Sequence, residues 1–268
     1  MRLKISHTTS YHYDAPVPYA LQQLRLRPKS RAEQTVLSWD LSVENGHQQL
    51  SFEDEHANTV DLISFEPGVS NITVHCEGEV EVTDTNGVVG KHSGYVPLWL
   101  FKRATPLTRA GSQLRALAAS LERTENDLSD LHALSALVLE RLPYSTQQES
   151  AELSAEQALN VGHGVCQDHA HVFIAAARHL DFPARYVSGY LMMNDRVDQD
   201  ASHAWAEVHV DGLGWVGFDI SNAMSPDARY VRVATALDYH GAAPVSGMRF
   251  GAASEALNVK LQVEQRQE

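Results

Sequence analysis

Residues 164–190 read GVCQDHAHVFIAAARHLDFPARYVSGY, and this stretch decides the fold expected for the chain. It begins at a glycine break, and its apolar residues then recur every three or four positions: Ala170, Phe173, Ile174, Ala177 and Leu180. This spacing predicts a helix with one buried stripe, which ends at Phe182-Pro183. The following ARYVSGYL, residues 184–191, is typical of a β-strand, so the sequence predicts a helix that leads directly into a sheet.

Further helices and strands surround this segment. The expected strands downstream are HAWAEVHV at 203–210 and GWVGFDI at 214–220. Three helices are expected upstream: one begins at Leu114, one runs from about Asp127 to Leu142, and one begins at Ser154. At the last of these, Gln157 completes a capping-box pattern. Helices followed by strands, without regular alternation of the two, predict a domain of the α+β class.

The first hundred residues have a different period. Apolar residues alternate with others in two runs: Thr35, Leu37, Trp39, Leu41 and Val43, and Ile72, Val74, Cys76, Val80 and Val82. Turn signals such as Asn45-Gly46 and Asn86-Gly87 separate the runs. The alternation stops between Pro97 and Pro106. We therefore expect an N-terminal antiparallel β-sandwich domain at 1–100 and a second domain at 107–268.

Composition limits the partners and the location of the protein. The hydrophobic content of 43% with 21% charged residues is that of a folded globular chain. With 21 Lys and Arg against 34 Asp and Glu, the net charge is −13, which argues against a nucleic-acid partner. No apolar stretch approaches the roughly 20 residues that a membrane-spanning helix needs, and no signal-peptide core is visible. We expect a cytoplasmic protein without membrane contacts.

The two cysteines of the chain require separate explanations. Two cysteines provide no disulfide framework, and no C-x-x-C pair indicates a structural zinc site. Cys76 lies on the inward parity of its expected strand and is predicted to be a core residue. Cys166 follows a glycine-broken turn at the start of a helix, where free N–H groups and the helix dipole favour a thiolate and can stabilise an oxyanion. Alone, Cys166 would be interpreted as a structural cysteine at a tight turn.

The two downstream strands supply the partners that a thiolate nucleophile needs, a base and a group that orients the base. His203 lies on the strand face opposite the apolar Ala204 and Ala206, and Asp219 shares a face with Trp215. The two side chains can meet only if the hairpin loop has an odd length or a bulge. We therefore predict a three-residue or bulged connection that leaves Asp219 opposite or diagonal to His203.

Three segments of the chain together resemble the transglutaminase-like superfamily, whose fold is similar to that of papain: GVCQDHAH, HAWAEVHVDGLGWVGFD and ALDYHGAAPVSGMRFG. The opening segments YDAPV and LRLRP resemble the β-domain that precedes this core in bacterial members. The resemblance implies that Cys166 is the nucleophile, His203 the general base and acid, and Asp219 the group that orients His203. Ile220 and Ser221 stand where the family usually has proline and threonine, which concerns the geometry of the loop more than the triad.

Other residues near these motifs have ordinary structural explanations. In some relatives an aromatic or glutamine side chain helps to bind the oxyanion, and Tyr144 is a candidate, although a ring packed beside a helix end is the simpler interpretation. Asp168 is expected to cap its helix. Trp205 and Trp215 are expected in the core rather than in a substrate cleft.

Histidines are frequent, but their spacing does not predict a metal centre. His169 and His171 point about 200° apart on a helix. His203 and His209 are separated by roughly 20 Å along a strand. We therefore predict no catalytic metal and no cofactor.

The predicted reaction is attack of the Cys166 thiolate on a side-chain or peptide amide of a protein or peptide, which gives a thioester. Water then gives hydrolysis, the favoured outcome, and an amine acceptor would give acyl transfer. The competing interpretations are a catalytically silent binding or scaffold module and, with less support, a metallohydrolase. The sequence leaves open the oligomeric state and whether the β-domain or the segment from Tyr239 to Arg249 covers the cleft.

Overall fold

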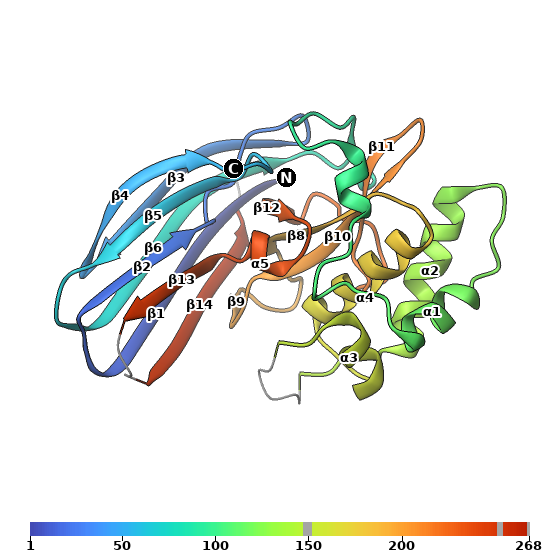
Figure 1. Cartoon of the computed structure of the whole chain (residues 1–268). Coiled ribbons are helices and arrows are strands. Elements are labelled where there is room, and N and C mark those ends of the chain that lie inside the picture. The colour runs from blue at the N-terminus through green and yellow to red at the C-terminus, as the bar shows by residue number, and fades with distance from the viewer. Residues whose placement is uncertain (147–151, 251–253, 267–268) are drawn as a thin grey trace.

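The computed structural model describes residues 1–146, 152–250 and 254–266. Figure 1 shows a half made of long strands beside a half that contains most of the helices. The named strands of the described chain form three sheets, and all neighbouring strands within them are antiparallel. Antiparallel sheets accompanied by separate helices correspond to the predicted α+β class.

A five-stranded sheet, named here the platform sheet, has the order β3-β6-β1-β14-β9. Its strands are β3 (Gln34–Glu44), β6 (Val69–Val82), β1 (Arg2–Val17), β14 (Glu255–Gln265) and β9 (Asp198–Gln199). A four-stranded sheet contains β13 (Val245–Phe250), β2 (Tyr19–Leu24), β5 (Thr59–Phe65) and β4 (Gly46–Glu53). A third sheet, the helix-backed sheet, contains β12 (Tyr230–Ala236), β8 (Ala184–Leu191), β10 (His203–Val210), β11 (Gly214–Phe218) and β7 (Val88–Gly90).

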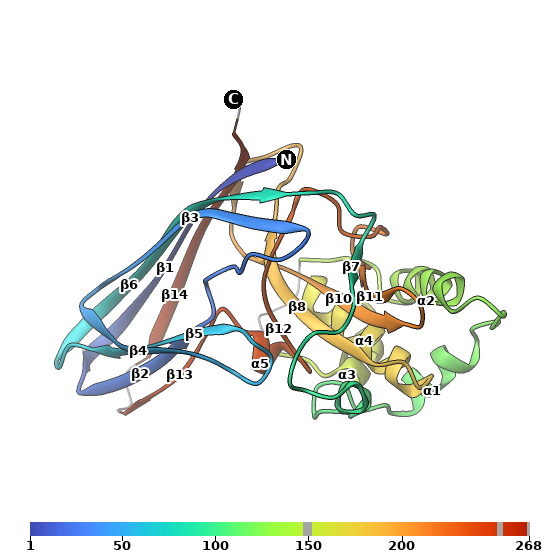
Figure 2. The same ribbon diagram turned by 90° about the horizontal axis from the view of Figure 1, so that it is seen from above.

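One face of the platform sheet supports both of the other sheets (Figure 2). The odd-numbered residues of β1 from Leu3 to Tyr13 are buried, as the two-residue period of a strand requires. Near the start of β1, Leu3 shares an apolar cluster with Tyr190 of the helix-backed sheet. Near its end, the Tyr13 ring lies 6.0 Å from the Phe65 ring of the four-stranded sheet. A single long strand therefore connects two cores.

The helices of the described chain are η1 (Leu98–Lys102), α1 (Ser112–Ala119), α2 (Asp127–Arg141), α3 (Ala155–Val161), α4 (Cys166–His179) and α5 (Tyr239–Ala242). Helix α4 lies against β10, and α1, α2 and α3 pack against α4. The capping box predicted for the third helix is present, with Ser154 and Gln157 exchanging hydrogen bonds. On α4 the Phe173 ring lies 5.2 Å from that of Phe218, which anchors the helix on the sheet. Within the described ranges, no helix is long and apolar enough to cross a membrane.

The boundary predicted between 100 and 107 does not separate the sheets completely. The predicted second domain ran to residue 268, but β14 pairs with β1 over eleven positions and β13 pairs with β2. Conversely, β7 from the predicted first domain pairs with β11. Each half thus provides strands for open edges of the other half, because unpaired backbone groups at a sheet edge are costly to bury.

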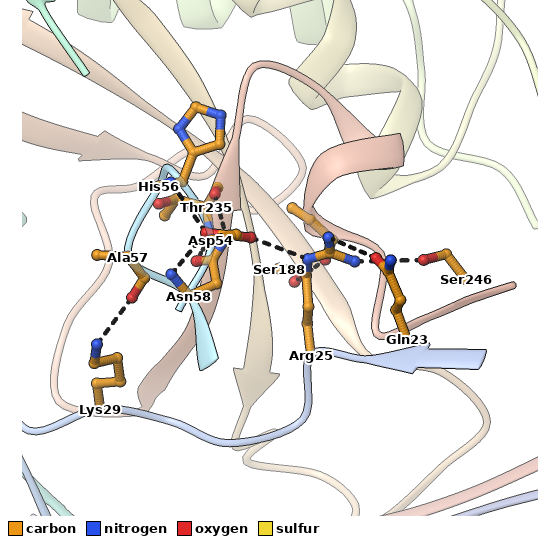
Figure 3. Close-up of polar contacts among 11 residues, drawn as sticks. Gln23, Arg25, Lys29, Asp54, His56, Ala57, Asn58, Ser188, Thr235 and Ser246 are labelled. Atoms are coloured by element: carbon orange, nitrogen blue, oxygen red, sulfur yellow. Dashed lines mark hydrogen bonds and ion pairs between the residues drawn. The ribbon is translucent and has the colours of Figure 1, made fainter. Parts of the chain in front are cut away.

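Two side-chain amides connect the halves along β12, the edge strand of the helix-backed sheet. Gln34 donates to the carbonyl of Arg232 at 2.9 Å and accepts from its N–H at 2.8 Å. Asn58 forms the same pair of bonds with Thr235, both at 2.8 Å, as Figure 3 shows. Asn58 is in turn held by Asp54 at 2.9 Å. The amides therefore pair with the edge of β12 as a neighbouring strand would.

Candidate active site

The segment before Cys166 is folded so that the cysteine begins a helix. The Asp168 carboxylate accepts a hydrogen bond from the N–H of Val165 at 3.0 Å, so it caps α4 as predicted. A Cβ at position 164 would lie 2.8 Å from the Asp168 Cβ, which explains the glycine in this motif. Gly164 is also held by the carbonyl of Pro143. Cys166 and Gln167 consequently occupy the first turn of α4, where N–H groups have no partner within the helix.

The hairpin of β10 and β11 brings His203 and Asp219 together. Val210 pairs with Gly214 across a loop of three residues, the odd length predicted from the sequence. The register continues to Ala206 opposite Phe218, which places Asp219 diagonal to His203 on the same face. The His203 Nε2 and Asp219 Oδ2 atoms lie 2.6 Å apart.

Asp219 lies in a fully buried site that satisfies its charge. Its Oδ2 accepts hydrogen bonds from the Tyr230 hydroxyl and the Asn222 amide, each at 2.7 Å, in addition to that from His203. Burial by itself would raise the pKa of Asp219, but these hydrogen bonds and the neighbouring imidazole lower it below its ordinary value. The carboxylate is therefore ionised near neutral pH and fixed in orientation.

His203 lies between the carboxylate and the thiol. Because Nε2 faces Asp219, Nδ1 is the nitrogen that remains for the hydrogen bond with Cys166. Burial would lower the pKa of His203, but hydrogen bonds with Asp219 and Cys166 and the negative charge of both partners raise it to about 10. The imidazole is thus held as the cation, with a proton directed at the sulfur.

The three predicted residues lie in the wall of a cavity of about 500 Å³ or directly behind it. Cys166 and His203 line the cavity, and Cys166 is partly exposed in it. The opposite wall consists of residues of the platform sheet: His7, Thr9, Tyr11, Leu257 and Val259. The cavity therefore lies between the helix-backed sheet and the N-terminal half of the fold. Tyr239 and Val245, from the C-terminal segment suspected of covering the cleft, lie on its border.

The other residues singled out in the sequence occupy different positions. Cys76 is completely buried, as predicted. Trp205 and Trp215 are also buried, so both belong to the core. Tyr144 is 52% exposed: its ring packs 6.0 Å from that of His169 beside the helix end, and it also lines the cavity.

The histidines around Cys166 have separate partners. His169 contacts the carbonyl of Leu142 at 2.6 Å and the hydroxyl of Ser221 at 2.7 Å. His171 accepts from the N–H of Tyr239 at 3.1 Å. Among the described residues, no group of three His, Cys, Asp or Glu side chains has the arrangement of a metal site.

Sequence reasoning did not find the residues that support Asp219. Asn222 lies three positions after Asp219 and also donates its N–H to Oδ1 at 3.2 Å, a local turn pattern that the sequence F-D-I-S-N could have indicated. Tyr230 comes from β12 and reaches Asp219 only through the pairing of β12 with β8. No local sequence signal distinguishes it.

Comparisons with known proteins agree with this arrangement. Residues 115–220 match the model of the transglutaminase-like superfamily, and residues 3–81 match that of the bacterial transglutaminase-like N-terminal region. The uncharacterized protein ML0607 of Mycobacterium leprae is 24% identical over 98% of both chains. The uncharacterized protein Rv2569c of Mycobacterium tuberculosis is 24% identical over 92% of this chain and 87% of its own.

The fold also has a solved counterpart. The crystal structure of a candidate cysteine protease from Cytophaga hutchinsonii superimposes with a TM-score of 0.78 and 20% identity, covering 100% of this chain and 92% of that one. Fold and site together define a protein with a cysteine at a helix start and a His–Asp pair on the adjoining sheet. The chain combines a transglutaminase-like core at residues 115–220 with a bacterial transglutaminase-like N-terminal region at residues 3–81.

Proposed function

We propose that the protein is a thiol enzyme that hydrolyses amides of proteins or peptides, with Cys166, His203 and Asp219 as a papain-like catalytic triad. The observation that carries the proposal is the His203 Nε2 contact with Asp219 Oδ2 at 2.6 Å, which leaves Nδ1 for a partly exposed thiol in a cavity wall. A cationic imidazole beside the sulfur favours the thiolate, the form of cysteine that attacks a carbonyl.

In the first half of the reaction, Sγ of Cys166 attacks the amide carbonyl carbon and a C–S bond forms. The electron pair of the carbonyl moves to oxygen, and free N–H groups of the first turn of α4, including that of Cys166, are placed to stabilise this oxyanion. Nδ1 of His203 then gives its proton to the leaving nitrogen, the C–N bond breaks, and the amine or ammonia departs. The product on the enzyme is a thioester.

In the second half, water attacks the thioester carbonyl while His203 accepts a proton from it. The C–S bond breaks, the carboxylic acid leaves, and the thiolate and imidazolium are restored. Asp219 stays ionised throughout and fixes the orientation of the ring. An amine that attacked in place of water would give acyl transfer by the same steps, and water is the proposed acceptor because it needs no dedicated binding site.

The test compares the two cysteines by alkylation and by acyl-enzyme formation. Iodoacetamide is expected to label Cys166 faster than Cys76 near neutral pH, and to lose this preference in His203→Ala. Incubation with an activated peptide ester should add one acyl group to Cys166, detected by mass spectrometry, and hydroxylamine should remove it. Slow labelling of Cys166 that is independent of His203, with no acyl adduct, would contradict the catalytic proposal and favour a scaffold function.

A further inference from the structure

The outer edge of β14 is open where it borders the candidate active site. Along its inner edge, β14 pairs with β1 from Glu255 to Gln265. On its outer edge, the short strand β9 covers only Leu261 and Gln262. In the part of the chain that the structure describes, no strand pairs with this edge between Glu255 and Lys260. Six described residues of β14 therefore have no neighbouring strand on this edge, and two of them, Leu257 and Val259, line the cavity.

The backbone of Leu257 and Val259 points toward this open side. The N–H of Arg266 is directed inward, to the carbonyl of Arg2, whereas that of Val263 is directed outward, to the carbonyl of Val197. Successive residues of an antiparallel strand direct their N–H and C=O groups to opposite edges. Val259 and Leu257 have the parity of Val263, so each presents a donor and an acceptor to the open edge.

The side chains of the same two residues face the reactive groups. Leu257 and Val259 line the cavity that also contains Cys166 and His203. Leu257 is 56% exposed, so its apolar side chain is accessible at the wall of the cavity. The open edge and the candidate active site thus form one continuous surface.

We propose that the substrate binds as an extended polypeptide that adds a strand to the outer edge of β14. This inference rests on the proposed function and specifies the class of substrate: an unfolded or locally extended segment, not a folded surface or a small amide. The added strand lies beside β14 in the platform sheet, in the position beyond the end of β9 at Gln199. Backbone hydrogen bonds to Leu257 and Val259 hold it, and an apolar substrate side chain packs on Leu257.

Continuity with the thiol distinguishes this occupant from a second copy of the chain. An edge-to-edge dimer would place a strand of another copy between the edge and Cys166, although the same cavity contains the groups that act on an amide. A peptide that enters this cavity in extended form can hydrogen-bond to the open edge of β14 and reach the Cys166 sulfur at the same time. The N-terminal half therefore acts as the substrate-docking wall of the cleft.

A peptide series tests the inference without altering the protein. The probe is a decapeptide of alternating serine and leucine with one central glutamine, and each member carries one N-methylated amide. Strand addition predicts that kcat/KM falls about fivefold or more at every second position, because only alternate N–H groups point to the edge. A uniform profile, or no effect of N-methylation, would overturn the inference.

A protein variant gives an independent measurement. Val259→Pro removes an N–H that is not used in pairing with β1, and it is expected to lower kcat/KM for the decapeptide about fivefold more than kcat/KM for p-nitrophenyl acetate. Asn258→Ala, an exposed residue of opposite parity, is the matched control and should leave both rates unchanged. Equal losses for both substrates in Val259→Pro, or a dimer that this substitution dissociates without affecting the peptide, would contradict strand addition.

The two proposals fail in different ways. An enzyme that turns over neither the ester nor the peptide contradicts the proposed function itself. Turnover of both substrates with a flat N-methylation profile contradicts only the docking edge.

Discussion

The two cysteines show how position in the fold decides the chemistry of the same side chain. Cys76 lies in the platform sheet, completely buried, with the Tyr190 hydroxyl 3.7 Å from its sulfur. Burial raises the pKa of this thiol to about 12, against a smaller opposite effect of the Tyr190 hydrogen bond. Cys166 is partly exposed at the start of α4, and it shares a hydrogen bond with the His203 cation. One thiol is held neutral in a core, and the other faces a cavity beside a positive charge.

The largest expected effect comes from removing the sulfur of each cysteine in turn, in two separate variants. Cys166→Ala should lower kcat by at least about 10⁴-fold, because the proposed acyl intermediate forms on the sulfur of Cys166. Cys76→Ala should retain kcat and cost roughly 1–2 kcal/mol of unfolding free energy through a small cavity. Turnover of a peptide amide and urea unfolding measure the two effects. Substantial activity in Cys166→Ala would contradict the assignment.

The next largest effect concerns the negative charge of Asp219, which keeps His203 protonated. Asp219→Asn keeps the size of the side chain but removes its negative charge, so the pKa of His203 should fall from about 10. We expect kcat to decrease roughly 10²- to 10⁴-fold, as for other catalytic histidines that lose a carboxylate. Titration of His203 by NMR and steady-state kinetics measure both consequences.

The control for Asp219→Asn removes the neighbouring Tyr230 hydroxyl and keeps the charge of Asp219. Tyr230→Phe deletes one hydrogen bond to Asp219 Oδ2, and a loss of less than about tenfold in kcat is expected. Losses of equal size in Tyr230→Phe and Asp219→Asn would indicate that packing, rather than the charge, limits the reaction.

Local features of this site could be predicted from the sequence because they follow from the geometry of short segments. The position of Cys166 at a helix start requires only the glycine break and the spacing of apolar residues after it. The meeting of His203 and Asp219 follows from strand parity and a loop of three residues. In both cases the conformation of a short backbone segment determines where the side chains lie.

The platform wall of the cleft could not be predicted in the same way. Tyr11 and Leu257 are paired neighbours although 246 positions (257 − 11) separate them in the chain. The alternation of β14 predicts a strand but not its partner, which is selected by the total burial of the sheet. For this reason the C-terminal strands were assigned to the second half, and the support of Asp219 by Tyr230 was missed.

The raised pKa of His203 should also appear in the pH dependence of stability. An unfolded histidine titrates near 6.5, whereas the pKa of folded His203 is raised to about 10. The folded state therefore binds the proton more tightly. The stabilisation is complete below about pH 6.5, decreases as pH rises, and is lost above about pH 10, an effect on the order of a few kcal/mol.

Urea unfolding of the wild type and His203→Gln at intervals from pH 6 to pH 10 measures this effect. The difference in unfolding free energy between the two proteins should shrink as the pH rises. Cys76 provides the comparison: burial raises the pKa of its thiol, so Cys76→Ala should stay parallel to the wild type until the pH approaches about 8.5, where the unfolded thiol begins to ionise. A constant difference between wild type and His203→Gln would contradict a raised pKa of His203.

The smallest expected effect on kcat separates assembly of the cleft from its chemistry. Asn58→Leu leaves the N–H and carbonyl of Thr235 without their amide partner at the edge of β12. Unpaired buried groups of this kind cost roughly 1–3 kcal/mol each, so unfolding free energy should fall by about 2–4 kcal/mol. Gln49→Leu, at an exposed amide that donates to the Ser64 hydroxyl, is the matched control and should change stability by less than about 0.5 kcal/mol. Because Thr235 lies near the opposite end of β12 from Tyr230, which contacts Asp219, kcat should be retained in the folded variant. A loss of kcat without a loss of stability would show that this end of β12 also positions the triad.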